Sequence, residues 1–283
     1  MNHTTLVTTG VLAAHLDDPN WIVFDCRHDL ARPDWGRAQY LQGHIPGARF
    51  MHLDTDLSGP LTGANGRHPL PDPAVFAAKL GAAGVGPQAQ VVAYDAHGGV
   101  YAARAWWLLR WLGHDAVAVL DGGYGRWLRE DRPQTAAPPR VEPKRFIAAV
   151  RPLAVDVAFV ASHLRDPALR LVDARAAERY RGENETLDPV AGHVPGAVNR
   201  FFKDNLEPDG GFKPAADLLR AWRAVQRDLS PTQIVHLCGS GVTACHNLLA
   251  MEIAGLTGSR LYAGSWSEWC ADRSRPYVTG ADP

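Results

Sequence analysis

The stretch LCGSGVTACHNLLA, residues 237–250, holds two of the four cysteines in the chain. Cys238 follows an apolar run that predicts a strand, and it precedes a glycine-rich turn and a helical pattern. Such a turn can point successive backbone N–H groups at one centre, and the start of the next helix adds partial positive charge. This cradle stabilises a thiolate, the form of cysteine that attacks. The loop formed by Gly239, Ser240, Gly241, Val242 and Thr243 therefore predicts an activated nucleophile at Cys238.

Three kinds of chemistry could use a cysteine in this loop. A phosphatase of the Cys-x5-Arg type needs a guanidinium to hold phosphate where this chain has Ala244, so phosphate transfer is disfavoured. A cysteine hydrolase needs a histidine base and an orienting partner, which can lie anywhere along the chain. Sulfur transfer needs only a thiolate that carries a second sulfur within a cradle of N–H groups. Sulfur transfer fits best, hydrolysis stays open, and a small buried hydrophobe is the inert alternative for Cys238.

The chain repeats itself, and the repeat bears on the role of Cys238. The stretch WIVFDCRHDLARPDWGRAQYLQGHIPGARF (21–50) recurs as LRLVDARAAERYRGENETLDPVAGHVPGAVNRF (169–201), and the segment 90–127 matches 233–269. Repeated landmarks in the same order indicate a tandem duplication. The first half carries Asp95 near the position that Cys238 occupies in the second half. The fold therefore does not need a thiol there, which favours a functional role for Cys238.

The repeat sets the expected organisation of the chain. Prolines crowd residues 132–152, where helical periodicity disappears, so we expect a domain over 1–135, a linker over 136–152 and a second domain over 153–283. Each half alternates short apolar strands with helical patterns, which predicts an α/β fold with a parallel sheet covered by helices on both faces. Ligands bind such sheets at the carboxyl ends of the strands, where Cys238 is expected to lie.

Composition and charge exclude several classes of protein. The 283 residues are 46% hydrophobic and 21% charged, as in ordinary globular proteins. The 29 basic residues balance the 30 acidic ones without a basic run, so a nucleic-acid partner is not expected. We expect no membrane span, because no apolar stretch is long enough. The spacing of the four cysteines predicts free thiols rather than disulfides or a metal site, and hence a cytoplasmic protein.

Several of these motifs together resemble the two-domain rhodanese superfamily of sulfurtransferases. They are the tandem Asp-x-Arg and Gly-His-hydrophobic-Pro-Gly-Ala motifs, the cysteine loop in the second half only, and GSWSEW near the end. The likeness covers nearly the whole chain and implies two tandem rhodanese-like domains. The loop CGSGVT is similar to that of the branch that uses 3-mercaptopyruvate, whereas members that use thiosulfate typically have Arg and Lys after the cysteine.

The resemblance implies a ping-pong reaction. The Cys238 thiolate would take sulfur from 3-mercaptopyruvate, become a persulfide, and pass the sulfur to cyanide or to a thiol, such as a thioredoxin-like protein or a low-molecular-weight thiol. No metal or organic cofactor is implied. Thiosulfate is the alternative donor. A persulfide carrier or sensor that docks a partner without turnover is the alternative function.

The resemblance also implies roles for residues outside the loop. Ser240 is expected to work with a histidine and an aspartate of the first half, which are His68 and Asp54, with Asp56 as the alternate carboxylate. Arg179 is expected to bind the carboxylate of the donor. The mercaptopyruvate branch usually has a second arginine a few residues later, but GENETLDPVAGH contains none. Either Arg181 or a residue elsewhere takes its place, or the donor differs.

Other notable residues have structural interpretations. His44 and His193 recur in both halves, as do Arg27 and Arg175, so we assign all four to the architecture of the fold. The arginines are expected to make internal charge-assisted bonds. Cys245 is expected to be packed, although it could also resolve an oxidised Cys238.

Overall fold

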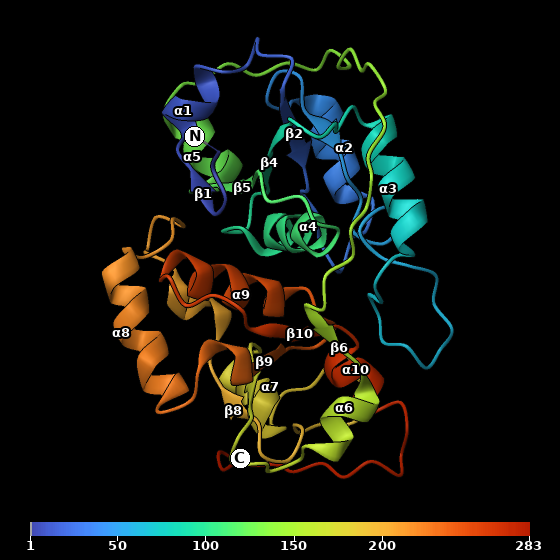
Figure 1. Ribbon diagram of the computed structural model, residues 1–283, viewed down its shortest axis with the longest axis vertical. Helices are drawn as coiled ribbons and strands as arrows, with labels where there is room; N and C mark the ends of the chain where they lie inside the picture. The colour runs from blue at the N-terminus through green and yellow to red at the C-terminus, as the bar shows by residue number, and fades with distance from the viewer. Residues whose placement is uncertain (1) are drawn as a thin grey trace. The chain divides into compact units, whose positions relative to one another are not determined.

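The computed structural model describes residues 2–283 (Figure 1). The chain contains two five-stranded parallel sheets, which confirms the predicted α/β class. It divides into two compact units. The first holds the chain up to Gly59 together with Pro71–Arg151 and Glu207–Phe212, and the second holds Pro60–Leu70, Pro152–Leu206 and Lys213–Pro283.

The first unit is built on a sheet with the strand order β1-β5-β4-β2-β3. Its strands are β1 (Leu6–Val7), β2 (Trp21–Asp25), β3 (Arg49–Phe50), β4 (Gln90–Tyr94) and β5 (Val117–Leu120). Its helices are α1 (Thr9–Ala13), α2 (Trp35–Gln42), α3 (Pro73–Ala82), α4 (Val100–Trp111) and α5 (Gly123–Arg129). Every residue of the central strand β4 is buried, as expected for a strand covered on both faces.

Helices cover both faces of this first sheet. Leu12 of α1 and Trp127 of α5 join Val92 and Tyr94 of β4 in one apolar cluster. Alternate residues of a strand point to opposite faces, so Val91 and Ala93 lie on the other face. Helix α4 packs against β4 and β5, and none of its described side chains belongs to that cluster. Figure 1 shows α4 on the opposite side of these strands from α1 and α5.

The second unit repeats this design. Its sheet has the order β6-β10-β9-β7-β8. Its strands are β6 (Ala154–Val155), β7 (Arg170–Asp173), β8 (Val198–Asn199), β9 (Ile234–Leu237) and β10 (Arg260–Tyr262). Its α-helices are α6 (Val157–Ser162), α7 (Ala177–Arg181), α8 (Ala215–Gln226), α9 (Thr243–Ile253) and α10 (Ser265–Trp269), and its short 3-10 helices are η1 (Phe202–Asn205) and η2 (Pro231–Gln233). Helices α6 and α10 share an apolar cluster with the sheet, while α9 packs against β9 and β10.

The duplicated arginines and histidines occupy equivalent internal positions in the two units. Arg27 forms a buried ion pair with Asp25 at 2.6 Å, and Arg175 forms one with Asp173 at 2.7 Å. Each guanidinium also donates to a backbone carbonyl, that of Gly43 or of Gly192. These are the expected internal charge-assisted bonds.

The histidines His44 and His193 are likewise buried, and each ring lies between two backbone carbonyls. Burial lowers the pKa of His193, which favours the neutral ring. Both histidines therefore connect segments of the fold, in agreement with their assignment to its architecture.

The Pro-rich segment 136–152, which is fully described, contains no helix or strand. Its backbone is nevertheless bonded to the first unit, because Lys144 N–H donates to Gly81 and Ala149 N–H donates to Leu112. The domain limits at residues 135 and 153 stay predictions. The compact units are not continuous in sequence, since Pro60–Leu70 packs with the second unit and Glu207–Phe212 with the first.

Candidate active site

Cys238 lies directly after β9, in the loop that leads to α9. Its side chain is buried, with the residue 2% exposed, and the N–H of Gly241 donates to its Sγ at 3.1 Å. Gly241 has φ +77°, and a Cβ at this position would lie 2.3 Å from the carbonyl oxygen of Ala263. Only glycine satisfies both conditions. The local sequence therefore turns a backbone N–H toward the sulfur.

The equivalent loop of the first unit shows what such a turn can bind. Asp95 follows β4, and its carboxylate accepts four backbone N–H bonds of 2.7–3.0 Å, from His97, Gly99, Tyr101 and Ala102. This loop is thus an anion cradle that holds its own carboxylate. In the second unit, Cys238 stands at the position of Asp95. The duplicated backbone is suited to hold a negative charge on sulfur.

Helix α10, which with its N-cap Gly264 forms the GSWSEW motif, holds the cysteine loop from the other side. Ser265 Oγ accepts the N–H of Cys238 at 3.1 Å. The N–H of Trp266 donates to the carbonyl of Cys238 at 3.0 Å, and that of Ser267 donates to the carbonyl of Gly239 at 2.9 Å. These bonds to the backbone of Cys238 and Gly239 fix the path of the loop.

Ser240 and His68 are in direct contact. His68 Nδ1 lies 2.7 Å from Ser240 Oγ, although the two residues are 172 positions apart. His68 is only 6% exposed, so it is not a solvated loop histidine. It belongs to the segment Pro60–Leu70, which packs within the second unit. The contact places the imidazole of His68 against the hydroxyl of Ser240, which lies two residues after Cys238.

Arg179 lies in the last turn of α7 and faces the start of the cysteine loop. Its Nη2 is 2.7 Å from Glu185 and 3.3 Å from Asp188, whose side chains are 2% and 3% exposed. Burial alone would raise the pKa of Glu185, but the hydrogen bonds from Arg179 and two backbone N–H groups hold that pKa below its usual value. A Cβ built on Gly239 would lie 3.6 Å from both Nη atoms of Arg179. The guanidinium is therefore held beside Gly239, the residue that follows Cys238.

Two further arginines bear on the missing second guanidinium. Arg181, the predicted substitute, forms an exposed ion pair with Glu183 at 2.7 Å. Arg67, which sequence reasoning missed, instead pairs with Asp188 and reaches Gly239. The sequence signal was available, since Arg67 directly precedes His68 in GRHPLP.

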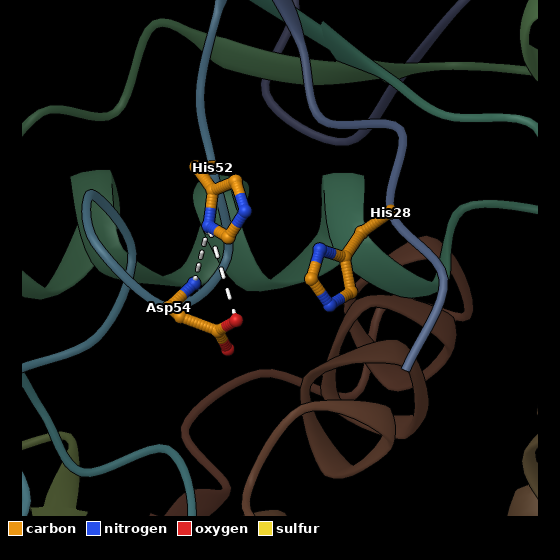
Figure 2. Close-up of side chains that lie close together, drawn as sticks. All are labelled: His28, His52 and Asp54. Atoms are coloured by element: carbon orange, nitrogen blue, oxygen red, sulfur yellow. Dashed lines mark hydrogen bonds and ion pairs between the residues drawn. The ribbon is translucent and has the colours of Figure 1, made fainter. Parts of the chain in front are cut away.

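Asp54 lies in the first unit beside His52 and His28 (Figure 2). Its side chain is 42% exposed, and its Oδ2 is 3.9 Å from His52 Nδ1. One ligand atom of each of these three residues lies within 4.8 Å of the others, a spacing that could suit a metal ion. However, His52 Nδ1 accepts the backbone N–H of Asp54, while His52 Nε2 lies 3.2 Å from the carbonyl of Pro33. Both ring nitrogens of His52 are thus engaged by protein, so the cluster is better suited to orient Asp54 than to bind a metal.

Asp56, the alternate carboxylate, has a structural role. It accepts the backbone N–H of His52 at 2.8 Å and forms an ion pair with Lys79 at 2.6 Å. Its carboxylate therefore closes a local turn and anchors α3.

All four cysteines lie among the described residues, and all are free and buried. Burial raises the pKa of Cys26 and of Cys270, so neither is prone to form a thiolate. Cys245 Sγ donates to the carbonyl of Gly241 at 3.2 Å, which supports the same loop. No helix within residues 2–283 has the length and apolar character needed to cross a membrane.

Comparisons with known proteins agree with the fold of two repeated units. Residues 8–130 and 156–272 match the family described as Rhodanese-like domain. The chain is 48% identical over 283 residues to a "Probable 3-mercaptopyruvate sulfurtransferase" of Pseudomonas aeruginosa, covering 99% of this chain and 100% of that protein. It is 37% identical over 241 residues to the "Thiosulfate sulfurtransferase" of Bos taurus, covering 82% and 79%. Among solved structures it is similar to SseA from Escherichia coli, a 3-mercaptopyruvate sulfotransferase, with a TM-score of 0.80, 34% identity and coverage of 94% and 100%.

Proposed function

Because this chain belongs to the rhodanese-like family of sulfurtransferases, we propose that it moves sulfur from 3-mercaptopyruvate to a thiol or cyanide through a persulfide on Cys238. In the first half-reaction the Cys238 thiolate attacks the sulfur of the donor. An S–S bond forms and the C–S bond breaks. The electron pair of the C–S bond stays on carbon, giving the enolate of pyruvate, which then takes up a proton. Cys238 is left as a persulfide.

The cysteine loop supports this step electrostatically. The persulfide carries its negative charge on sulfur within a turn whose Gly241 N–H already donates to Cys238 Sγ at 3.1 Å. The same turn in the first unit gives four N–H bonds to a carboxylate. Fixed N–H donors in a buried site stabilise developing charge without reorganisation.

The contact between His68 and Ser240 is the observation that carries the choice of donor. Mercaptopyruvate becomes an enolate, so its reaction needs a hydrogen-bond donor at the keto oxygen and a proton for carbon. A hydroxyl and an imidazole 2.7 Å apart can provide both. Thiosulfate needs no such proton delivery. We assign Asp54 as the carboxylate that supports His68, and this assignment stays a prediction.

The donor's carboxylate is assigned to Arg179. Its guanidinium lies beside Gly239 and its side chain is 20% exposed, so an anion from solvent can reach it. Its Nε and Nη2 are bonded to Glu185 and Asp188, which leaves Nη1 to donate a charge-assisted hydrogen bond to the donor's carboxylate. This would set the donor sulfur against Cys238.

In the second half-reaction an acceptor attacks the outer sulfur of the persulfide. With cyanide, a C–S bond forms, the S–S bond breaks, and thiocyanate leaves with the Cys238 thiolate restored. With a dithiol, the first thiolate takes the sulfur, and the second thiol displaces it as hydrosulfide while a disulfide forms. We expect these thiol acceptors to be met in the cytoplasm, where free buried cysteines also stay reduced.

Steady-state sulfur transfer by the purified protein tests the proposal. The donors are 3-mercaptopyruvate and, separately, thiosulfate, the acceptors are cyanide and a dithiol, and Cys238→Ser is the control. We expect turnover with mercaptopyruvate to be preferred and to be lost in Cys238→Ser. A preference for thiosulfate would make thiosulfate the donor in place of 3-mercaptopyruvate. Absence of Cys238-dependent turnover with either donor would favour a persulfide carrier or sensor.

A further inference from the structure

Arg67 lies beside Gly239 of the cysteine loop, although the two residues are far apart in the sequence. It lies in the segment Pro60–Leu70 of the second unit, and its backbone N–H donates to Ser267 Oγ at 3.0 Å. The N–H of the same Ser267 donates to the carbonyl of Gly239. One serine thus joins the backbone of Arg67 to the residue after the nucleophile.

The approach of this segment is close enough to require glycine before Arg67. Gly66 has φ +80°, and a Cβ there would lie 2.7 Å from the carbonyl oxygen of Gly264 and 3.0 Å from Ser267 Oγ. A residue with a side chain would push the segment away from α10. The backbone that carries Arg67 and His68 is therefore held firmly against the loop.

The guanidinium of Arg67 is held on one side and open on the other. Its Nη1 pairs with Asp188, whose second oxygen lies 3.3 Å from Arg179 Nη2. Its Nη2 points at Gly239, where a built Cβ would lie only 2.8 Å away. Within residues 2–283, neither Nη2 of Arg67 nor Nη1 of Arg179 has a hydrogen-bond partner. The two side chains are 31% and 20% exposed.

From these contacts we infer that Arg67 and Arg179 together bind the anionic group of the sulfur donor, with Asp188 bracing both guanidinium groups. This inference rests on the proposed function, in which the anion is the carboxylate of mercaptopyruvate. It also accounts for the missing second arginine after Arg179. A residue from a distant segment takes that place in space, whereas Arg181 is occupied by Glu183. Two guanidinium groups with free donors can hold both oxygens of one carboxylate.

The first experiment compares Arg67→Ala, Arg67→Lys and the matched control Arg181→Ala in steady-state transfer from 3-mercaptopyruvate. Loss of a charge-assisted hydrogen bond should lower kcat/KM about 10- to 100-fold in Arg67→Ala, mainly through KM. Arg67→Lys keeps the positive charge but loses the planar guanidinium, so its kcat/KM should lie between those of Arg67→Ala and the wild type. Arg181→Ala should stay within about twofold of the wild type, since exposed ion pairs contribute little.

The second experiment needs no turnover and separates binding from folding. The rate at which Cys238 is alkylated is measured with iodoacetate, which carries a carboxylate, and with neutral iodoacetamide, and Cys238→Ser gives the background from the other cysteines. The rate with iodoacetate divided by the rate with iodoacetamide should fall about 10-fold in Arg67→Ala and stay unchanged in Arg181→Ala. If Arg67 only supports the fold, both rates will change by the same factor and the ratio will hold, which would overturn the inference.

The two experiments distinguish the inference from the proposed function. If the wild type uses thiosulfate but not mercaptopyruvate, and the alkylation ratio still depends on Arg67, the donor assignment fails and the two-arginine anion site stands. If mercaptopyruvate is used but neither kcat/KM nor the ratio depends on Arg67, the proposed function stands and the role of Arg67 is refuted.

Discussion

The pair formed by His68 and Ser240 is the residue-scale feature with the clearest chemical consequence. Each side chain alone has an ordinary explanation, because a serine suits a tight loop and a histidine suits a Gly/Pro-rich segment. Their separation of 2.7 Å in a buried place makes a polar unit that can pass a proton. Its action would be felt in the chemical step rather than in the formation of the thiolate.

We therefore expect His68→Gln to lower kcat with mercaptopyruvate by about 100-fold or more, as loss of a general acid–base group does. Ser240→Ala should have a similar effect, and the double variant should be little worse than either single one, because the two residues act as a unit. The rate of Cys238 alkylation by iodoacetamide should change little. Additive losses in the double variant would show that the two side chains act separately.

The two neighbouring aspartates of the first unit can be told apart in the same assay. Asp54→Asn should lower kcat if Asp54 supports His68, with little loss of stability because its side chain is largely exposed. Asp56→Asn should leave kcat unchanged but lower the free energy of unfolding by about 1 kcal/mol, since it weakens a bond to His52 N–H and an ion pair with Lys79. The reverse pattern would make Asp56 the functional carboxylate.

At the scale of elements, the strand–loop–helix unit is the part of the fold that makes an anion site. The loop after β4 and the loop after β9 have the same position in their sheets. One is filled by the carboxylate of Asp95 and the other carries the sulfur of Cys238. The backbone provides N–H donors in both loops, four to the carboxylate of Asp95 and one, from Gly241, to the sulfur of Cys238.

Gly241→Ala tests the geometry of the cysteine loop, and Gly210→Ala is its control. Both glycines have a positive φ, of +77° and +88°, but a Cβ at Gly210 meets nothing within 4 Å, whereas at Gly241 it meets Ala263. Gly210→Ala should cost about 1 kcal/mol of folding free energy through backbone strain alone. Gly241→Ala should cost at least about 3 kcal/mol and abolish sulfur transfer. Equal losses of stability would mean that the loop can move away from Ala263.

For the whole molecule, burial of titratable side chains links stability to pH. His236 lies in the central strand β9, where burial lowers its pKa from 6.5 to about 3. The unfolded chain therefore binds more protons than the folded one between these values. Stability must fall as the pH falls through 6.5 toward 3. His193 and His114, whose pKa values burial also lowers, act in the same direction.

Urea unfolding at pH 7.5 and at pH 5.5 measures this linkage. The contribution of His236 to the free energy of unfolding should fall by about 1.4 kcal/mol between these two pH values. His236→Leu removes the titrating group, so this variant should lose that much less stability than the wild type over the same range. An unchanged pH dependence in His236→Leu would show that His236 does not carry the effect.

Much of this protein was determined by its sequence alone. Apolar runs that alternate with helical patterns, and motifs that recur in order, predicted two parallel α/β sheets, because burial on both faces selects such residues locally. The glycines around Cys238 predicted a turn, since their freedom at positive φ is a local property. The loop and the duplicated ion pairs follow from short-range patterns of this kind, as does the prediction of Cys238 as the nucleophile.

Only the tertiary structure decided which distant side chains meet this loop. His68 reaches Ser240 across 172 residues, and Arg67 rather than Arg181 pairs with Asp188 and faces Gly239. Hydrophobic periodicity records which face of an element is buried, but not which surface it packs against. The segment Pro60–Leu70 has no periodic pattern, and its position depends on the close approach of Gly66 to Gly264 and Ser267, which lie far away in the sequence.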